Sequence, residues 1–346
     1  MNQQNNIKDP LKTVSYDYNL PQELIATYPA NPADSAKLLV YNRKTQQITH
    51  TTFHSLLDFI PKECEIFFND TKVIKARIFG KKETGGKIEL LFNKPLPDNQ
   101  YLVYMRGKVL VDNIITFEKN LTVHVLALQE DGTRIVKFFK DEKELDFLTL
   151  VEILNEIGHL PLPPYIKRED EKSDDINYQT LFAKNYGAVA APTASLHFTP
   201  ELLSELKEKY HTNYLTLHVG AGTFKPVESD DILDHPMHSE FYEIPKSSEE
   251  VLQSDKKILA VGTTVTRTVE FYNDTKQSSG EANLFLNPHN PPKRVDYLLT
   301  NFHLPKSTLI MLVASFVGLE KTMEIYEEAI RNKYRFFSYG DGMLII

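Results

Sequence analysis

Four histidines stand in short polar loops beside apolar runs, where an imidazole can exchange a proton with a bound ligand. They are His197, His218, His238 and His303. Histidine changes its charge near neutral pH without a large pKa shift, which suits a general acid or base. Glu240 lies two residues after His238, so in an extended segment both side chains point to the same side and can form an acid–base pair. The sequence therefore predicts a site for proton transfer.

Two alternatives to this interpretation stay open. The imidazole of His197 could bridge backbone groups in a buried loop. His235, His238 and Glu240 could instead bind zinc in a metal-dependent hydrolase. Pro236 stands between the two histidines, however, and argues against the helical face on which paired zinc-binding histidines usually lie. We favour acid–base chemistry and expect no metal.

Residues 262–267 indicate a second kind of ligand site. A glycine follows an apolar strand, and Thr263 and Thr264 then open a helix whose free backbone N–H groups and hydroxyls suit a carboxylate. Arg267 follows one turn into the helix. The alternative is a self-capped helix with an arginine on the surface.

The segment 217–224 lets backbone approach a ligand closely, because it contains Gly220, Gly222 and Thr223. Lys225 occupies the place of the third glycine in the dinucleotide-binding fingerprint, and no helix signal follows, which argues against a nicotinamide site. A glycine-bearing turn without a ligand is the alternative. Four further residues in polar loops complete the candidate substrate-binding set: Thr193, Phe198, Asn301 and Asp341.

The elements that must position these residues follow two patterns. Residues 1–61 and 149–346 alternate strand-like and helical segments, and an apolar face at helical spacing runs from Phe147 to Ile157 where the second of these parts begins. Residues 62–148 contain short β-rich runs separated by turn formers, which is typical of a small antiparallel barrel. We therefore predict an α/β fold, in which a larger α/β domain (1–61 plus 149–346) carries an inserted small antiparallel β-barrel domain (62–148).

Composition limits the function classes. The 346 residues suffice for about two domains, and 41% hydrophobic with 25% charged residues is typical of a soluble globular protein. A net charge of −8 should repel nucleic acid, so any RNA contact must be local. The single cysteine, Cys64, allows no internal disulfide, and the start of the chain is not signal-like. These features predict a cytoplasmic protein that does not enter a membrane.

One segment departs from the acidic average. Residues 71–87 contain six cationic side chains and one anionic side chain, Glu83. Such a patch on a β domain could bind phosphates, and a solvated strand face is the alternative. The cations are Lys72, Lys75, Arg77, Lys81, Lys82 and Lys87.

Ten short strings occur in order between about Tyr16 and Ile345. They are residues 68–71 with 76–77, 82–87, 161–166, 178–180, 187–199, 217–224, 237–240, 260–264, 299–305 and 335–344. Together they resemble the S-adenosylmethionine:tRNA ribosyltransferase-isomerase family of queuosine biosynthesis. The sequence departs from the family at Ser195, at Ala221 and at residues 287–290, where the family usually has glycine, leucine and Tyr-Pro-Gly.

The resemblance implies an enzyme that joins the ribosyl group of S-adenosylmethionine to the aminomethyl arm of 7-aminomethyl-7-deazaguanine at a tRNA wobble position. Rearrangement to an epoxycyclopentanediol then gives epoxyqueuosine-tRNA, adenine and methionine. S-adenosylmethionine is consumed as a substrate, so no separate cofactor is expected. The expected partners are tRNA and S-adenosylmethionine, and we expect a monomer, with a weak dimer as the alternative. A non-catalytic RNA-binding module remains the rival from another class.

The resemblance also suggests roles for the candidates. The four histidines with Glu240 would line one reaction centre, and the two glycines with Thr223 would approach the ribosyl or adenine part. The methionine carboxylate would meet Thr263, Thr264 and Arg267, and its ammonium group would meet Asp341. The tRNA would meet Lys72, Arg77, Lys82 and Lys87.

Overall fold

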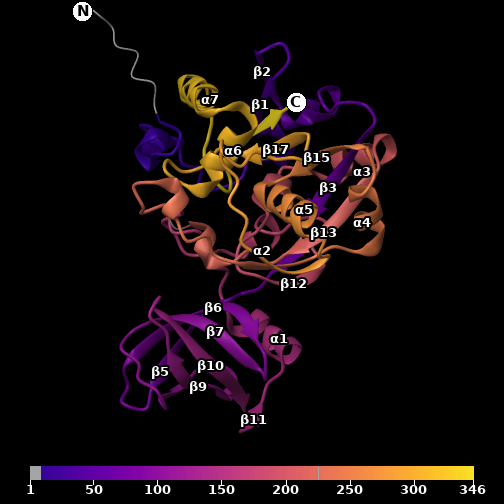
Figure 1. Cartoon of the computed structure of the whole chain (residues 1–346). Coiled ribbons are helices and arrows are strands. Elements are labelled where there is room, and N and C mark those ends of the chain that lie inside the picture. Colours follow the sequence, from indigo (N-terminus) through magenta and orange to yellow (C-terminus); the bar gives the residue numbers. More distant parts are fainter. Residues whose placement is uncertain (1–8, 225) are drawn as a thin grey trace, which may run out of the picture.

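The computed structural model of this chain describes residues 9–224 and 226–346, which form two large sheets of different shape (Figure 1). One sheet has nine strands and organises the larger domain, to which both ends of the described chain belong. The other curls into a barrel that forms a smaller domain below it in Figure 1. The barrel is an insertion in the larger α/β domain, which confirms the predicted fold class.

The nine-stranded sheet is mixed and has a parallel centre. In spatial order its strands are β16 (Ser279–Ala282), β14 (Glu240–Glu243), β13 (Thr212–Leu217), β3 (Cys64–Asn69), β15 (Lys257–Val261), β17 (Tyr297–Asn301), β18 (Gly342–Ile345), β1 (Lys37–Asn42) and β2 (Gln47–Thr52). The four consecutive strands β13, β3, β15 and β17 are parallel, and β1 is parallel to β18. The remaining neighbours pair antiparallel. The carboxyl ends of the four parallel strands therefore meet at one edge.

Helices cover both faces of this sheet. One face is covered by α4 (Lys246–Leu252), α5 (Thr263–Thr275), α6 (Thr308–Val317) and α7 (Leu319–Arg331). The other is covered by α3 (Pro200–Lys209) and the 3-10 helix Phe53–Asp58. Successive strand side chains alternate between the two layers. Leu39 and Ile258 pack in the first, whereas Leu38 and Leu259 pack in the second.

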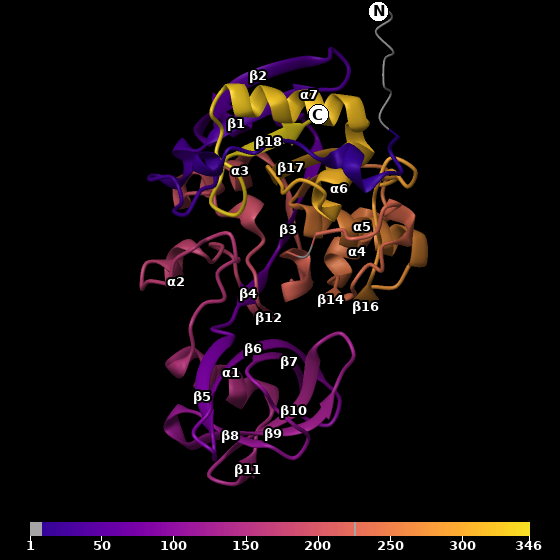
Figure 2. The ribbon, with the colours of Figure 1, turned by 90° about the vertical axis from the view of Figure 1, so that its left-hand side faces the viewer.

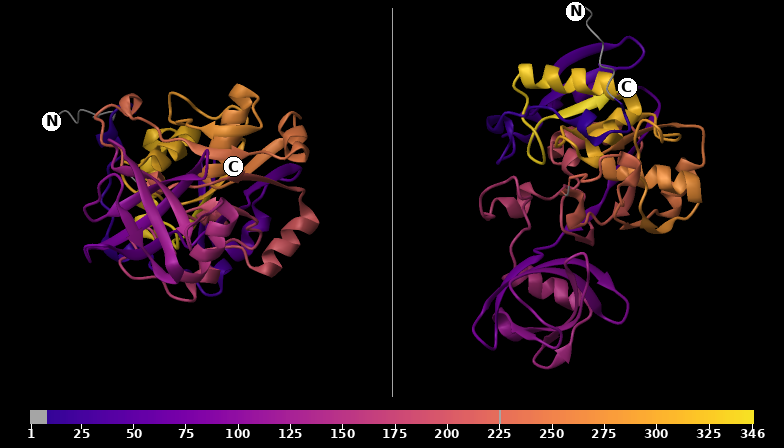
Figure 3. Two further views of the ribbon diagram at one scale, coloured as in Figure 1. Left: turned by 90° about the horizontal axis from the view of Figure 1, so that it is seen from below. Right: turned by 60° about the vertical axis from the view of Figure 1, so that its left-hand side comes forward.

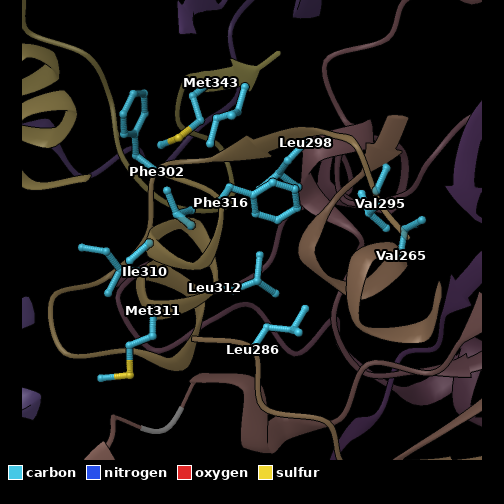
Figure 4. Packing of buried hydrophobic residues seen from close by; sticks show 14 of the residues in the cluster. Val265, Leu286, Val295, Leu298, Phe302, Ile310, Met311, Leu312, Phe316 and Met343 are labelled. Carbon is cyan, nitrogen blue, oxygen red and sulfur yellow. The ribbon is translucent and has the colours of Figure 1, made fainter. Parts of the chain in front are cut away.

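The first layer is densely packed around α6. In Figure 4, Val265 of α5, Leu298 of β17 and Leu312 and Phe316 of α6 lie in the space between these elements. All four side chains are buried. Burying one such side chain contributes about 1.5–3 kcal/mol. This layer therefore fixes the start of α5 relative to the end of β17, where candidate residues stand.

The smaller domain is a closed antiparallel barrel. Its strands are β5 (Arg77–Lys82), β6 (Lys87–Leu96), β7 (Gln100–Arg106), β8 (Ile114–Thr116), β9 (Leu121–Leu128), β10 (Thr133–Lys140) and β11 (Lys143–Glu144). The pairing of β9 with β10 closes six strands into a ring, and β11 extends beside β10. Helix α1 (Phe147–Ile157) packs Leu150 and Leu154 into the barrel core and overlies one opening in Figure 3.

Two short strands join the domains. β4 (Thr71–Val73) leads into the barrel and β12 (Asn185–Ala188) returns from it, and the two pair parallel in the narrow connection seen in Figure 2. The returning segment contains α2 (Asp174–Asn177). The other 3-10 helices are Thr13–Tyr16, Gln22–Leu24, Ala33–Ser35, Glu118–Asn120, Thr193–Ser195, Ala221–Phe224 and Ile232–Asp234.

The domain boundaries differ from those expected from the sequence, 62–148. Residues 64–69 form β3 at the centre of the nine-stranded sheet, and the barrel strands begin only at Arg77. Helix α1 packs on the barrel and does not begin the second α/β part. The physical reason is that a β-rich run or an amphipathic helix shows which residues are buried but not which partner buries them.

Two simpler expectations concern the whole chain. Within the described ranges, every helix is too short or too polar to span a bilayer. Cys64 is buried in β3, and burial raises the pKa of its thiol to about 12. A thiol that stays protonated at neutral pH is a packing group, since the thiolate is the reactive form.

Candidate active site

The candidate residues gather where the parallel strands β3, β13, β15 and β17 end. Ligands in α/β proteins bind outside the carboxyl ends of such strands. Two adjoining hollows lie there, which we call the inner pocket and the interdomain pocket. His197, which was expected in the reaction centre, lines neither of them. The single reaction centre predicted from the sequence is therefore divided.

The inner pocket lies within the larger domain, between α5, the end of β17 and the loop 190–194. Gly262 precedes α5 with a φ of 99°, a conformation that favours glycine, and it turns the chain so that α5 begins at the pocket wall. The first-turn N–H groups of a helix have no partner within the helix and carry partial positive charge. The candidates that line this pocket are Thr193, Thr263, Thr264, Asn301 and His303.

Asn301 organises one wall of the inner pocket. Its side-chain oxygen accepts a hydrogen bond from the Thr193 hydroxyl at 3.0 Å, and its amide nitrogen lies 3.1 Å from Nε2 of His197. The same amide donates to the backbone oxygen of Gly340 at 3.4 Å. Asn301 is buried, so these bonds satisfy its amide and hold the Thr193 hydroxyl at the pocket wall.

His303 is a buried, neutral member of the inner pocket. Its Nε2 lies 3.0 Å from the Thr300 hydroxyl, and its backbone N–H donates to the Tyr326 hydroxyl. Burial lowers the pKa of His303 to about 3. A neutral imidazole at physiological pH can donate or accept a hydrogen bond but carries no positive charge there.

His197 does not line either pocket. Its ring stacks on Phe53 with the centroids 4.1 Å apart, and burial together with the positive charge of Arg335 lowers its pKa to about 3. Its only described hydrogen bond is the one to Asn301. The side chain therefore supports the pocket wall from behind, which is close to the structural alternative that the sequence left open.

We expect His197 to make the protein acid-sensitive. Its folded pKa is depressed, so unfolding takes up a proton below pH 6.5, and stability is lost as the pH falls from about 6.5 toward 3. The slope for one such group is at most about 1.4 kcal/mol per pH unit. Urea unfolding of His197→Gln between pH 4.5 and 7.5 should show a shallower slope than the unaltered protein. Parallel curves for the two proteins would contradict this assignment.

The interdomain pocket lies between the barrel and the larger domain. The barrel contributes Asn93, Lys94 and Tyr104 to its walls, and Lys94 forms an ion pair with Glu281 of the larger domain at 3.1 Å. The candidates that line it are His218, Gly220, Gly222, His238 and Glu240. A substrate bound there would touch both domains.

His218 is held in place from two sides. Its Nδ1 lies 2.8 Å from the Thr71 hydroxyl, and its ring stacks near Phe241. Gly187 has a φ of 152°, and a Cβ there would lie 2.8 Å from the imidazole, so only glycine fits. Burial lowers the pKa of His218, and the charge of Asp70 opposes this shift. Among the described residues, Nε2 has no hydrogen-bond partner.

Glu240 is a buried carboxylate with a fixed charge. Its Oε2 accepts from Nη1 of Arg267 at 2.7 Å, and its Oε1 accepts from the backbone N–H of Gly220 at 2.9 Å. Burial alone would raise its pKa, but Arg267, His238 and the Gly220 N–H lower it to about 2. Nε2 of His238 lies 3.7 Å from Oε1. Glu240 therefore stays ionised near neutral pH, holds the Gly220 N–H and places a negative charge beside His238.

Comparisons with known proteins show the family to which the chain belongs. A sequence model described as "Queuosine biosynthesis protein" matches residues 13–345. The chain belongs to this family. Relatives named "S-adenosylmethionine:tRNA ribosyltransferase-isomerase" include proteins of Aliarcobacter butzleri and Nitratiruptor sp., which are 69% and 62% identical, each over 98% of this chain and 99% of the relative. The crystal structure of an S-adenosylmethionine tRNA ribosyltransferase from Thermotoga maritima covers 96% of this chain and all of its own at 33% identity, with a TM-score of 0.53.

Three of the candidate substrate-binding residues make structural contacts instead. Arg267 is buried, bonds Glu240 and the backbone oxygen of Leu284, and is not part of the inner pocket wall. Asp341 accepts from the backbone N–H groups of Lys37 and Arg335, which fixes β18 beside β1. Phe198 packs in the core under the sheet.

Each correction has a physical reason. Arg267 and Asp341 were expected to meet the methionine carboxylate and ammonium, but buried charges need compensation and these two find it within the protein. Phe198 is apolar and finds enough partners to be buried. The side chain of Thr223 lies outside the described residues.

The four candidate tRNA-binding residues are spread over the barrel and the strands that connect it to the larger domain. Lys72 on β4 lies over the Tyr186 ring, and Arg77 pairs with Glu89 at 2.8 Å. Lys82 donates to the backbone oxygen of Lys108, and Lys87 is exposed at the start of β6. Only part of this set is therefore available to phosphates.

The zinc alternative finds no ligand cluster. In residues 9–224 and 226–346, no three His, Cys, Asp or Glu side chains gather as metal ligands would. The ring of His235 instead packs edge-on against Phe285.

Several contributing residues carried no role in the sequence-based prediction. Thr71 fixes the ring of His218, and Asn69 bonds the backbone of Leu217 and the hydroxyl of Thr264, so it connects the walls of the two pockets. The signal for both was present, because Asn69-Asp70-Thr71 follows an apolar run directly. Tyr104 left no such signal, since only the docking of the barrel brings it to the pocket.

Proposed function

We propose that this chain transfers the ribosyl group of S-adenosylmethionine to 7-aminomethyl-7-deazaguanine at the tRNA wobble position and isomerises it. The products are epoxyqueuosine-tRNA, adenine and methionine. The observation that supports this most is the family match over residues 13–345, together with relatives of that name at up to 69% identity. S-adenosylmethionine is a consumed substrate, so the proposal needs no metal and no separate cofactor. The enzyme acts in the cytoplasm as a monomer.

The inner pocket suits S-adenosylmethionine. The first turn of α5 offers backbone N–H groups and the hydroxyls of Thr263 and Thr264 to the methionine carboxylate. Arg267 is left out of this contact because Glu240 already neutralises it. The neutral ring of His303 and the Thr193 hydroxyl then face the remainder of the nucleoside.

The interdomain pocket suits the modified base. The sulfonium makes the adjoining ribose carbon electron-poor and its protons more acidic, so a nearby base can remove one. His218 is neutral at physiological pH and its Nε2 is unpaired among the described residues, which fits it for that proton. His238 lies beside the Glu240 carboxylate in this pocket, where it can exchange a proton with the departing adenine or the incoming amine.

One assay tests the whole proposal. Purified protein mixed with S-adenosylmethionine and tRNA carrying 7-aminomethyl-7-deazaguanine should release adenine and methionine in equal amounts. tRNA with an unmodified guanine should release neither, because it lacks the aminomethyl arm. Tight tRNA binding without adenine release would instead support a non-catalytic RNA-binding module and overturn the proposal.

We expect Thr263→Val to weaken S-adenosylmethionine binding selectively. Loss of a hydroxyl that bonds a charged group costs about 1.5–3 kcal/mol, which corresponds to a 10- to 150-fold higher KM for S-adenosylmethionine. The KM for tRNA should stay the same. Thr275→Val is the matched control, since Thr275 is exposed in the last turn of the same helix. An unchanged KM in Thr263→Val would exclude this contact.

A further inference from the structure

The outer face of the barrel strands β5, β6 and β7 has an unusual composition. Side chains alternate across these strands, and Ile78, Ile88 and Leu90 point into the barrel core. The outward residues of β5 are Arg77, Phe79 and Lys81. Through the strand register, Phe79 stands opposite Glu89, and Glu89 stands opposite Arg106.

Phe79 is an aromatic side chain left open to solvent. It is 49% exposed in the middle of a strand, although an apolar side chain of this size is usually buried. The guanidinium of Arg77 lies over its ring, 5.0 Å from the centroid, and Glu89 holds that guanidinium at 2.8 Å. The ring of His159 meets Phe79 edge-on. These contacts orient the ring but leave about half of it available.

Cations surround this ring at a cost to the barrel. Lys81 and Lys87 stand directly opposite each other on neighbouring strands, where like charges destabilise the pair. Neither lysine forms an ion pair within the described ranges. The side chain of Arg106 is 86% exposed, and its closest contact with the Glu89 carboxylate is a long one, at 3.5 Å. The hollow beside the ring is lined by three cations, Lys81, Lys87 and Arg106, and by two anions, Glu89 and Glu118, in a chain whose net charge is −8.

This surface is continuous with the proposed reaction centre. Phe79, Lys81, Lys87 and Arg106 line one hollow on the barrel. Arg106 and Glu89 also line a second hollow, which reaches Tyr104 and the segment 160–164. Tyr104 in turn lines the interdomain pocket. Because neighbouring hollows share wall residues, an extended single strand of RNA can run from the barrel face to His218.

We propose that Phe79 is a stacking platform for an unpaired nucleotide of the tRNA, outside the nucleotide that is modified. Lys81, Lys87 and Arg106 bind the phosphates on either side of that nucleotide. This inference rests on the proposed function, since it takes tRNA as the partner. Exposed aromatic rings among cations bind single strands, because every base has a face that stacks, whereas a paired base hides its faces in the helix.

The first test uses the absence of tryptophan from the sequence. Phe79→Trp creates a single tryptophan, whose fluorescence should be quenched in a saturable way by an RNA hairpin with the sequence of the anticodon arm. A fully paired RNA duplex of the same length should not quench it. Leu126→Trp is the matched control, because Leu126 is exposed on β9 of the same barrel. Equal quenching of both variants, or none in Phe79→Trp, would overturn the proposal.

A second test separates stacking from charge. Phe79→Ala should weaken tRNA binding about 5- to 150-fold, the effect of losing one base stack, without altering its salt dependence. Phe79→Tyr should restore it. Lys81→Ala should instead reduce the salt slope by about one. The loss in Phe79→Ala should appear in the Kd and the KM for tRNA.

The two proposals fail in distinguishable ways. If the unaltered protein releases adenine but Phe79→Ala binds tRNA as tightly as it does, the platform is wrong and the proposed function stands. If the unaltered protein releases no adenine, the proposed function is wrong.

Discussion

Arg267→Met is expected to destabilise the protein by about 3–5 kcal/mol, because it removes the cation that pairs with the buried Glu240 carboxylate. Both side chains are almost completely buried, at 4% and 2% exposure, and their closest atoms are 2.7 Å apart. Such a loss is a large part of the total stability of a typical domain. The midpoint of urea unfolding measures it directly.

The double variant Arg267→Met with Glu240→Gln tests the cause. Removing both charges leaves no unpaired ion, so most of the lost stability should return, whereas independent effects would add. Arg331→Met is the control, since Arg331 pairs with Glu328 at 2.6 Å on the surface and should contribute no more than about 1 kcal/mol. A double variant as unstable as the sum of its parts would contradict a specific ion pair.

The same pair has a signature in acid. The folded pKa of Glu240 is depressed to about 2, so its contribution is complete above pH 4.5 and is lost as the pH falls toward 2. In Arg267→Met the principal cause of this depression is gone, and burial then raises the pKa of Glu240. The variant should therefore lose less stability than the unaltered protein between pH 4.5 and 2.

The sequence predicted the fold class more accurately than the domain boundaries. The runs 87–92 and 121–128 lie on barrel strands, where buried residues alternate with partly or fully exposed ones, as a barrel imposes. In β3 all six residues are buried, which indicates a strand covered on both faces. The span 62–148 that the sequence assigned to the barrel therefore included a strand of the nine-stranded sheet.

The candidate site residues were likewise predicted by type and position but not by their neighbours. His197 and His218 both follow short apolar runs, but one stacks on Phe53 in the core and the other lies against a pocket. Residue type and spacing could not separate them, because the difference is set by which neighbours cover each ring. Arg267 was placed at the correct end of helix α5, yet its partner Glu240 lies 27 residues away on strand β14.

His218→Asn is expected to lower kcat by about 10²–10⁴-fold, the usual effect of losing a general base. The Thr71 hydroxyl lies 2.8 Å from Nδ1, and in the tautomer whose Nδ1–H donates to that hydroxyl, Nε2 can accept a proton in the interdomain pocket. Single-turnover release of adenine measures the step. His124→Asn is the matched control, because His124 packs on Phe139 on the barrel and has no contact with either pocket.

Two neighbouring positions show whether His218 acts through its position. Thr71→Val removes the hydroxyl that orients the ring and should lower kcat about tenfold, while Thr71→Ser should keep it. Gly187→Ala adds a Cβ 2.8 Å from the imidazole and should displace the ring, with a larger loss of kcat than of tRNA affinity.

The pH profile of kcat/KM supplies the decisive readout. Because burial depresses the pKa of His218, kcat/KM should stay high below pH 6.5 and fall only when that imidazole is protonated. An acid limb that is unchanged in a residually active His218→Asn would assign the proton to another group.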